Sequence, residues 1–239
     1  MALTLRGSAE NSSGTLIDLT ITHPVGIANE DSVYVAYVQG GSTDLNLSIV
    51  TAGYTELADL FSNDTTDCNF GVFRKIMGVT PDSDVVCDNV GNSSTIAGVE
   101  HVWTGADQTT PEDATTTTAT GIDAAAPDSP SIVTATPAAI VLAIGGSSEA
   151  DATVVAPTGY SNQIDRALGL TVGMASKSVA SPGTEDPAVW TNFSGNANDS
   201  WCAATVAVRP AATGAAGDGL EWASLPPRPP RPPAFIAAY

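Results

Sequence analysis

The alternation of apolar and polar residues along the chain predicts β-strands from the first residues onward. In "TLIDLTITHP", residues 15–24, Ile17, Leu19 and Ile21 fall on one side and polar residues on the other. This two-residue period is typical of a strand with one buried face. Helical periodicity is nearly absent from the chain. Only residues 54–61 and 160–168 have a pattern that would also suit one or two helical turns.

Longer apolar runs predict central strands that are covered on both faces. They are "SVYVAYVQGG" at 32–41 and "AAIVLAIGGSS" at 138–148, and "SWCAATVAVRP" at 200–210 predicts the last strand of the folded body. Clusters of Gly, Asn, Asp, Ser and Pro separate such runs throughout the chain. Short strands with turn signals between them are typical of a β-sandwich or barrel.

Two parts of the sequence resemble each other at a fixed spacing. "VAYVQGGS" at 35–42 parallels "VLAIGGSS" at 141–148, and Gly53–Tyr54 parallels Gly159–Tyr160. The GGS copies are 105 residues apart and the GY copies 106, so the register is nearly constant. We therefore predict an all-β, antiparallel, jelly-roll-like β-sandwich built from two duplicated halves. The alternative is a chance similarity among valine-rich strands.

The predicted organisation is a folded body followed by an extended tail. Its parts are a body at 1–210 with halves at 1–105 and 131–210, a Thr-rich connector at 106–130, a flexible linker at 211–224 and a proline-rich arm at 225–239. The small residues of the linker favour flexibility, and the arm favours a polyproline II conformation.

Composition narrows the classes of partner. The chain has 239 residues, with 26 acidic against 8 basic residues and a formal net charge of −18. Phosphate binding needs clustered Lys and Arg, so we expect neither nucleic acid nor a membrane surface as a partner. The start of the chain lacks the pattern of a signal peptide. We expect Cys68, Cys87 and Cys202 to be reduced thiols, with a Cys68–Cys87 disulfide as the alternative.

The sequence contains few motifs that indicate catalysis. His23 and His101 are the only histidines, and neither has a nucleophile motif beside it. We therefore expect no enzymatic activity, no cofactor and no metal. Calcium binding by two acidic clusters is an alternative to a solvated turn, although the EF-hand spacing is missing; the residues are Asp64, Asp67, Asp82, Asp84 and Asp88.

Aromatic residues supply a second alternative. Tyr54, Trp103, Tyr160 and Trp190 could form a platform on which a glycan stacks. Aromatic residues of a β-sandwich also pack in its core, and that interpretation competes with the first.

The body resembles a loose class of bacteriophage virion proteins. The similarity covers residues 1–210 and rests on three features: "SAENSSGTLIDLT" before the first alternating strand, "VYVAYVQGG" followed by "TAGYTEL", and "SWCAATVAVRP" at the end. The resemblance implies a structural protein of the virion, made in the host bacterial cytoplasm, without catalysis. Capsid and tail locations both remain open.

The resemblance and the composition together give the expected function. We predict a surface component of the capsid or tail, bound to other virion proteins and to copies of itself. A carbohydrate-binding or receptor-binding module that contacts a host surface glycan is the alternative. The arm is the predicted docking element, through Arg228, Arg231, Phe235, Ile236 and Tyr239. An SH3-type ligand and a plain tail are competing interpretations of that segment.

Overall fold

The computed structural model describes residues 2–15, 17–63, 67–91, 95–122, 126–150, 154–193 and 200–212. All regular elements of these residues are β-strands, and all of the strand pairs are antiparallel. The strands are β1 (Thr4–Ser13), β2 (Leu19–Thr22), β3 (Ser32–Gln39), β4 (Thr55–Ser62), β5 (Cys68–Ile76), β6 (Asp84–Cys87), β7 (Ile96–Thr104), β8 (Thr117–Gly121), β9 (Ile132–Thr134), β10 (Ala139–Ser147), β11 (Ser161–Ala167), β12 (Thr171–Val179), β13 (Gly183–Glu185) and β14 (Trp201–Val208).

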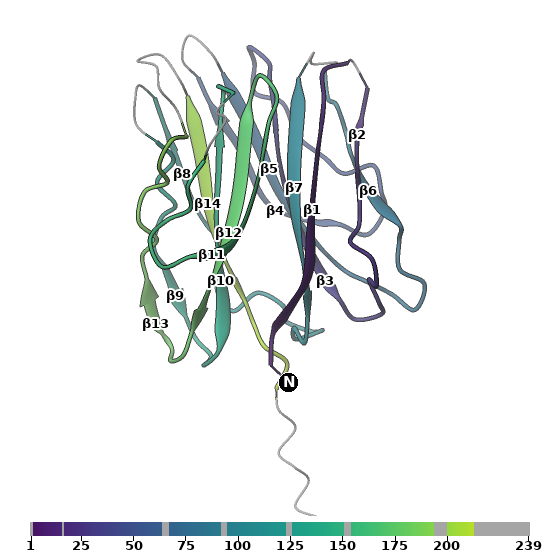
Figure 1. Cartoon of the computed structure of the whole chain (residues 1–239), viewed down its shortest axis with the longest axis vertical. Helices are drawn as coiled ribbons and strands as arrows, with labels where there is room; N and C mark the ends of the chain where they lie inside the picture. Colours follow the sequence, from purple (N-terminus) through teal and green to yellow (C-terminus); the bar gives the residue numbers. More distant parts are fainter. Residues whose placement is uncertain are drawn as a thin grey trace, which may run out of the picture.

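Two five-stranded sheets pack face to face (Figure 1), which confirms the predicted antiparallel β-sandwich. Sheet I has the order β1-β7-β3-β5-β4, and sheet II has the order β8-β14-β10-β12-β11. When the two orders are read side by side, each strand of sheet I has the same position in its sheet as the strand of sheet II that comes seven elements later in the chain. The two small pairs, β2-β6 and β9-β13, follow the same rule. The halves of the chain thus share one topology.

The jelly-roll part of the prediction is not confirmed, because the chain does not alternate between the two large sheets. The first half completes sheet I before the chain passes to sheet II, and the crossing falls between β7 and β8. The predicted loop connector at 106–130 is also wrong in part. It contains β8, an edge strand that pairs with β14, so the second half begins at Thr117.

The central core lies between the sheets. The predicted central strands β3 and β10 are buried over their whole length, and each is the third of five strands. Because both faces are covered, their side chains are divided between the central core and an outer layer. Val38 and Ile144 point into the central core, whereas Val35 and Ala143 point outward.

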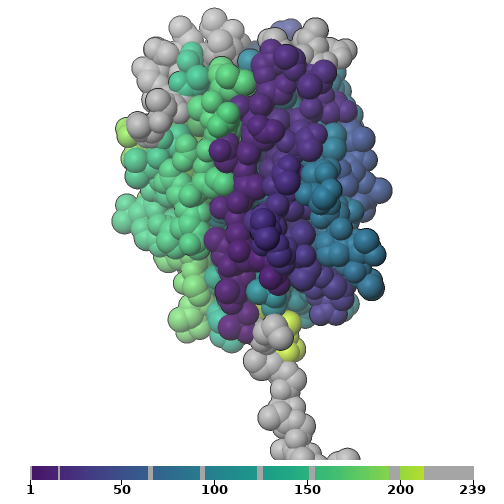
Figure 2. All heavy atoms as spheres, turned by 45° about the vertical axis from the view of Figure 1, so that its right-hand side comes forward, coloured from purple at the N-terminus to yellow at the C-terminus, as the bar shows by residue number. Residues whose placement is uncertain are grey.

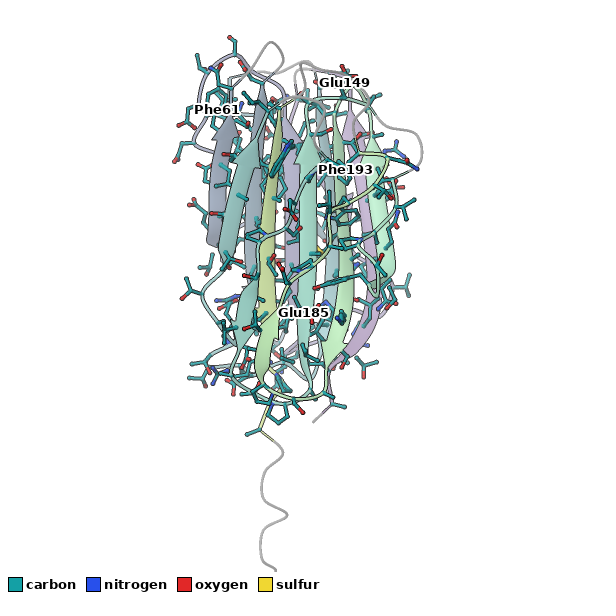
Figure 3. All side chains as sticks on the ribbon, turned by 90° about the vertical axis from the view of Figure 1, so that its left-hand side faces the viewer. Phe61, Glu149, Glu185 and Phe193 are labelled. Carbon is teal, nitrogen blue, oxygen red and sulfur yellow. The ribbon has the colours of Figure 1, made fainter. Side chains whose placement is uncertain are left out.

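Each sheet carries an additional outer layer. The β2-β6 pair covers sheet I, where Leu19 and Ile21 pack against Tyr37 and Phe73. Ile17, predicted to share the buried face of β2, lies before the strand and is 63% exposed. The outer layer of sheet II contains Trp190 and Phe193, whose rings meet edge to face with centroids 5.2 Å apart. Figure 3 shows Phe193 on this outer side.

The segments at 54–61 and 160–168, for which helical turns were considered, are edge strands β4 and β11. Each pairs with a long neighbour, and each has a register shift near its start, between Glu56 and Ala58 and between Ser161 and Ile164. The sheet hydrogen bonds decide the conformation here, because weak local helix preference cannot compete with a full ladder.

The sheet edges lie against each other along the long seams. Along one seam, Arg166 of β11 pairs with Glu10 of β1 at 3.2 Å and donates to the Ser12 hydroxyl at 2.8 Å. Figure 2 shows this seam, where the purple N-terminal residues run the length of the molecule between green and blue surfaces. Along the other seam, the Ser62 hydroxyl of β4 donates to the Gly121 carbonyl of β8 at 2.8 Å. These contacts cover edges that would otherwise offer unpaired backbone groups.

Candidate functional site

The first and last described residues meet at one end of the sandwich, which we call the basal pole. Ala2 and Ala212 line the same hollow there. The Ala211 amide donates to the Gly105 carbonyl, and the Asp107 amide donates to the Arg209 carbonyl. The segment that follows β14 is thereby held beside the connection between the halves. The opposite end, where Phe61 and Glu149 lie in Figure 3, is the distal pole.

The basal hollow has a volume of about 490 Å³. Four segments build its walls: the N-terminus, the connection after β7, the β9–β10 turn and the end of β14. The lining residues are Ala2, Asp107, Thr136, Pro137, Ala138, Arg209, Pro210, Ala211 and Ala212. Most are small and apolar, and the two charged residues stand among them. A hollow of this size with few polar groups is typical of a binding site for an apolar group.

Asp113 holds one wall of the hollow in place. It is buried, and it accepts hydrogen bonds from the Ala135 amide at 2.6 Å and from the Thr136 amide at 3.0 Å. The Thr136 hydroxyl donates to the same carboxylate at 2.7 Å. The Arg209 Nε lies 3.3 Å from Asp113 Oδ1, in ion-pair contact but without hydrogen-bond geometry. The β9–β10 turn and the end of β14 are thus joined through one carboxylate.

Asp107 supplies the negative charge of the hollow. Its Oδ1 accepts the backbone amides of Thr109 and Thr110, each at 2.8 Å. The hydrogen bonds from Thr110 and Thr109 lower the pKa of this partly exposed carboxyl, so it is ionised at neutral pH. The sequence patterns did not single out Asp107 as a site residue. Its signal was the sequence Asp-Gln-Thr-Thr-Pro at 107–111, which is typical of a turn capped by the aspartate side chain.

The basic residues of the body are all engaged in ion pairs. Each of the six Lys and Arg side chains in the described residues contacts a carboxylate: Arg6 with Asp31, Arg74 with Glu112, Lys75 with Asp82, Arg166 with Glu10, Lys177 with Glu185, and Arg209 with Asp113. Residues 1–212 hold 24 of the 26 acidic residues of the chain. The body therefore has a large excess of negative charge, and its own cations already have partners.

The five predicted docking residues lie outside the described residues. They are Arg228, Arg231, Phe235, Ile236 and Tyr239, all within 213–239. Arg228 and Arg231 are the two bases of the chain that do not belong to the body.

The predicted glycan platform is wrong for its two tryptophans. Trp103 is 2% exposed in the central core, and Trp190 is fully buried beneath the outer layer of sheet II. Tyr54 and Tyr160 are half-buried on the outer sides of different sheets, and a lysine lies over each ring. Four aromatic rings in separate layers cannot form one planar surface for a sugar.

A second hollow, of about 410 Å³, lies at the distal pole, next to the end of β3 and the start of β7. Its lining residues are Gly40, Gly41, Ser42, Thr43, Leu45, Val90, Gly91 and Thr95, and none of them is charged. Asn69 supports the wall, because its side chain accepts from the Leu45 amide at 2.9 Å and donates to the Gly41 carbonyl at 3.5 Å. Neutral polar groups of this kind can hydrogen-bond hydroxyl-rich ligands.

Both histidines are buried in the interior. His101 of β7 faces the central core, and its Nε2 lies 2.9 Å from the Asn162 carbonyl of β11, so it links the two sheets. Burial lowers the pKa of His101 to about 4, so it is neutral and donates this hydrogen bond. His23 Nδ1 lies 2.9 Å from Glu100 Oε2, beneath the outer layer of sheet I. Burial raises the pKa of Glu100, and the hydrogen bond from His23 opposes that shift.

The three cysteines are free thiols and are buried. Cys87 lies in the outer core of sheet I, whereas Cys68 and Cys202 lie in the central core. Cys68 and Cys87 are therefore on opposite faces of the sheet, which excludes the disulfide considered from sequence. The Cys202 thiol contacts the Cys68 carbonyl at 3.6 Å.

Of the acidic residues considered for calcium, Asp64 lies outside the described residues, and Asp82, Asp84 and Asp88 have other contacts. Lys75 pairs with Asp82, the Ser83 hydroxyl donates to Asp84 at 2.7 Å, and the Ser48 hydroxyl donates to Asp88 at 3.0 Å. Among the described residues, no three His, Cys, Asp or Glu side chains are grouped as metal ligands would be. The described part of the chain also has no helix with the length and apolarity that a membrane span requires.

Comparison with known proteins gives no relative: no protein-family model, no curated protein and no solved structure matches this chain.

Proposed function

We propose that this protein is a non-enzymatic structural component of a bacteriophage virion, displayed on the surface of the capsid or tail. Its body stands on the particle by the basal pole, and the segment at 213–239 joins it to neighbouring virion proteins. The observation that carries the proposal is the meeting of Ala2 and Ala212 at one pole. Attachment at that pole leaves the whole distal pole exposed to the surroundings.

Three further features support this function. The sandwich is covered on both sides by outer layers and its edges lie against each other, which suits a rigid module exposed to solvent. Both histidines serve internal contacts and are buried, which favours a structural role. The acidic excess of the body favours solubility and keeps exposed faces from associating without a specific contact.

Immunolabelling of particles tests the location. Antibodies against the purified protein should label virions at regular positions, seen by electron microscopy of particles banded in a density gradient. A protein that remains entirely in the soluble fraction, with no label on any particle, would contradict the proposal.

Truncation tests the role of the C-terminal segment. A chain that ends after Ala212 should keep the melting temperature of the full chain, because residues 2–212 contain both sheets and both outer layers. It should fail to join particles that assemble in the presence of the tagged full-length control. Equal incorporation of both chains would remove the anchoring role of the segment.

A second candidate function is receptor binding at the distal pole, and the uncharged distal hollow favours it. The ligand class would be a neutral saccharide of the host surface, held by hydrogen bonds rather than by aromatic stacking. Saturation-transfer NMR with a panel of methyl hexopyranosides tests it. Replacing Thr43 with Trp should fill the hollow and abolish any signal, while unchanged transfer would place binding elsewhere.

A further inference from the structure

We propose that the basal hollow is the acceptor for residues 225–239 of a second copy of this chain. The inference rests on the proposed function and deepens it, because it names the protein that receives the C-terminal segment. The segment of one copy would insert its apolar end into the hollow of its neighbour, and one of its arginines would pair with the Asp107 carboxylate in the lining. Copies would thus be linked through their basal poles.

Charge complementarity is the first argument. The six bases of the body are already paired with carboxylates, so the body has a negative surface and engaged cations. Arg228 and Arg231 are the remaining bases of the chain, and they follow the body. A copy of this protein is therefore a fitting partner for its own C-terminal segment. Arginine pairs well with carboxylates at interfaces because its guanidinium donates several hydrogen bonds in a fixed plane.

The hollow itself places a carboxylate beside an apolar wall. Asp107 is partly exposed, and its orientation is fixed by the Thr109 and Thr110 amides. Pro137, Ala138 and Pro210 form apolar parts of the lining. The segment has the matching order in sequence: two arginines, then Phe235, Ile236 and Tyr239. Aromatic groups in a hollow with an arginine at its rim are typical of the residues that dominate binding energy.

The length of the segment favours a neighbour over the same copy. The segment departs from Ala212, which already lines the hollow of its own body. Residues 226–233 would extend about 25 Å as a polyproline II rod, and a flexible linker of the length of 213–224 has a root-mean-square reach of about 19 Å. The segment starts at the hollow, so its end could reach that same hollow only if the linker and the rod ran in opposite directions. A neighbour is reached with rod and linker pointing the same way.

The spacing of the arginines fits this rod. Polyproline II has three residues per turn, so Arg228 and Arg231 would project from the same side. The rod is also stiff before it binds, which reduces the conformational freedom lost on docking. Both arginines could then face the same neighbour, with one of them at Asp107, while the apolar residues enter the hollow.

Sedimentation velocity of the full-length chain over a concentration series tests the proposal. We expect reversible self-association that a synthetic peptide of residues 225–239 inhibits. Arg228→Glu/Arg231→Glu should weaken association by at least about tenfold, as expected when a charge-assisted contact with Asp107 is replaced by repulsion. Asp107→Asn keeps an acceptor for the Thr109 and Thr110 amides and removes the charge, so it should weaken association by a smaller factor.

Ala212→Trp tests the hollow directly, because Ala212 is exposed and a large side chain there would occupy the site. It should abolish association without a change in melting temperature. Ala188→Trp is the matched control, since Ala188 is also exposed but is not part of the lining, and it should associate like the natural chain. A full chain that stays monomeric at every concentration would overturn the proposal, and so would Ala212→Trp behaving like the control.

This result is separable from the proposed function. If the protein is not a virion component, antibodies will label no particle whatever its oligomeric state. If it is one but another protein receives the segment, particles will be labelled and the Ala212→Trp protein will be incorporated normally.

Discussion

Lys75 and Lys177 occupy corresponding places in the two halves of the molecule. Each lies over a tyrosine ring, 5.4 Å from the Tyr54 centroid and 5.8 Å from the Tyr160 centroid. Lys75 pairs with Asp82 just before β6, and Lys177 pairs with Glu185 of β13. On both sides of the sandwich, a lysine of the main sheet thus forms an ion pair with the outer layer. Figure 3 shows Glu185 on the sheet II side.

Replacing Lys177 with Met should lower the free energy of unfolding by about 1–3 kcal/mol. The change removes the cation–π contact and leaves Glu185, which is 8% exposed, without its cation. Lys177→Arg keeps the charge and serves as the control. Urea denaturation measures the difference, and equal midpoints for the Met and Arg variants would show that the ion pair contributes nothing.

His101 should make stability fall as the pH decreases. Burial lowers its pKa to about 4 in the folded protein, against about 6.5 in the unfolded chain. Between these values the unfolded chain binds a proton that the folded chain excludes, so the free energy of unfolding should drop on the order of 3 kcal/mol as the pH falls from 6.5 to 4.

His101→Gln isolates this effect, because Gln retains an N–H donor for the Asn162 carbonyl but does not titrate. Stability should be measured for both proteins at pH 7 and pH 4.5. The raised pKa of Glu100 acts in the opposite direction, with stability lost as the pH rises above its unfolded value, but it acts in both proteins. The natural protein should lose more stability on acidification than the variant. Parallel losses would assign the pH dependence to other groups.

His23→Leu should destabilise the protein by about 3–5 kcal/mol at pH 7, since Glu100 would remain buried without its partner. At pH 4 the carboxyl is protonated and the loss should be much smaller. The double variant His23→Leu/Glu100→Met replaces the pair by apolar groups and should recover most of the stability. A single variant as stable as the double at pH 7 would show that the pair is not coupled.

The thiols should be unreactive in the folded protein. Cys68, Cys87 and Cys202 are buried, and burial raises the pKa of Cys87, which reduces its reactive thiolate form. Iodoacetamide at pH 8 should leave the folded chain unmodified and should modify three sites in concentrated urea, as read by intact mass. Rapid modification under native conditions would indicate that the central or outer core opens.

The Gly53–Tyr54 and Gly159–Tyr160 pairs show how well the sequence predicted local structure. Both glycines have positive φ, +89° and +86°, and both pairs directly precede an edge strand, β4 or β11. The spacing of these pairs therefore predicted matching corners. The sequence did not predict that the following segments would be strands, because helix and strand patterns are hard to separate in eight residues that lie at an edge.

The basal hollow illustrates what local patterns cannot supply. Its lining comes from four segments that are up to about two hundred residues apart, and no motif connects Ala2 with Thr136 or Arg209. The same holds for the tryptophans, for which the sequence favoured core packing but left a surface platform open. Only the position of Trp103 between the sheets and of Trp190 beneath an outer layer decided between those alternatives.

The sequence alone determined the all-β class, the central strands β3 and β10 and the acidic character of the protein, because apolar runs, alternation and charge are properties of short segments. The tertiary structure decided which strands share a sheet, why Cys68 and Cys87 are separated and where the two ends of the body meet. Those relationships depend on burial of both faces of two sheets at once. Residues distant in the chain come together for that reason, and only the folded chain specifies them.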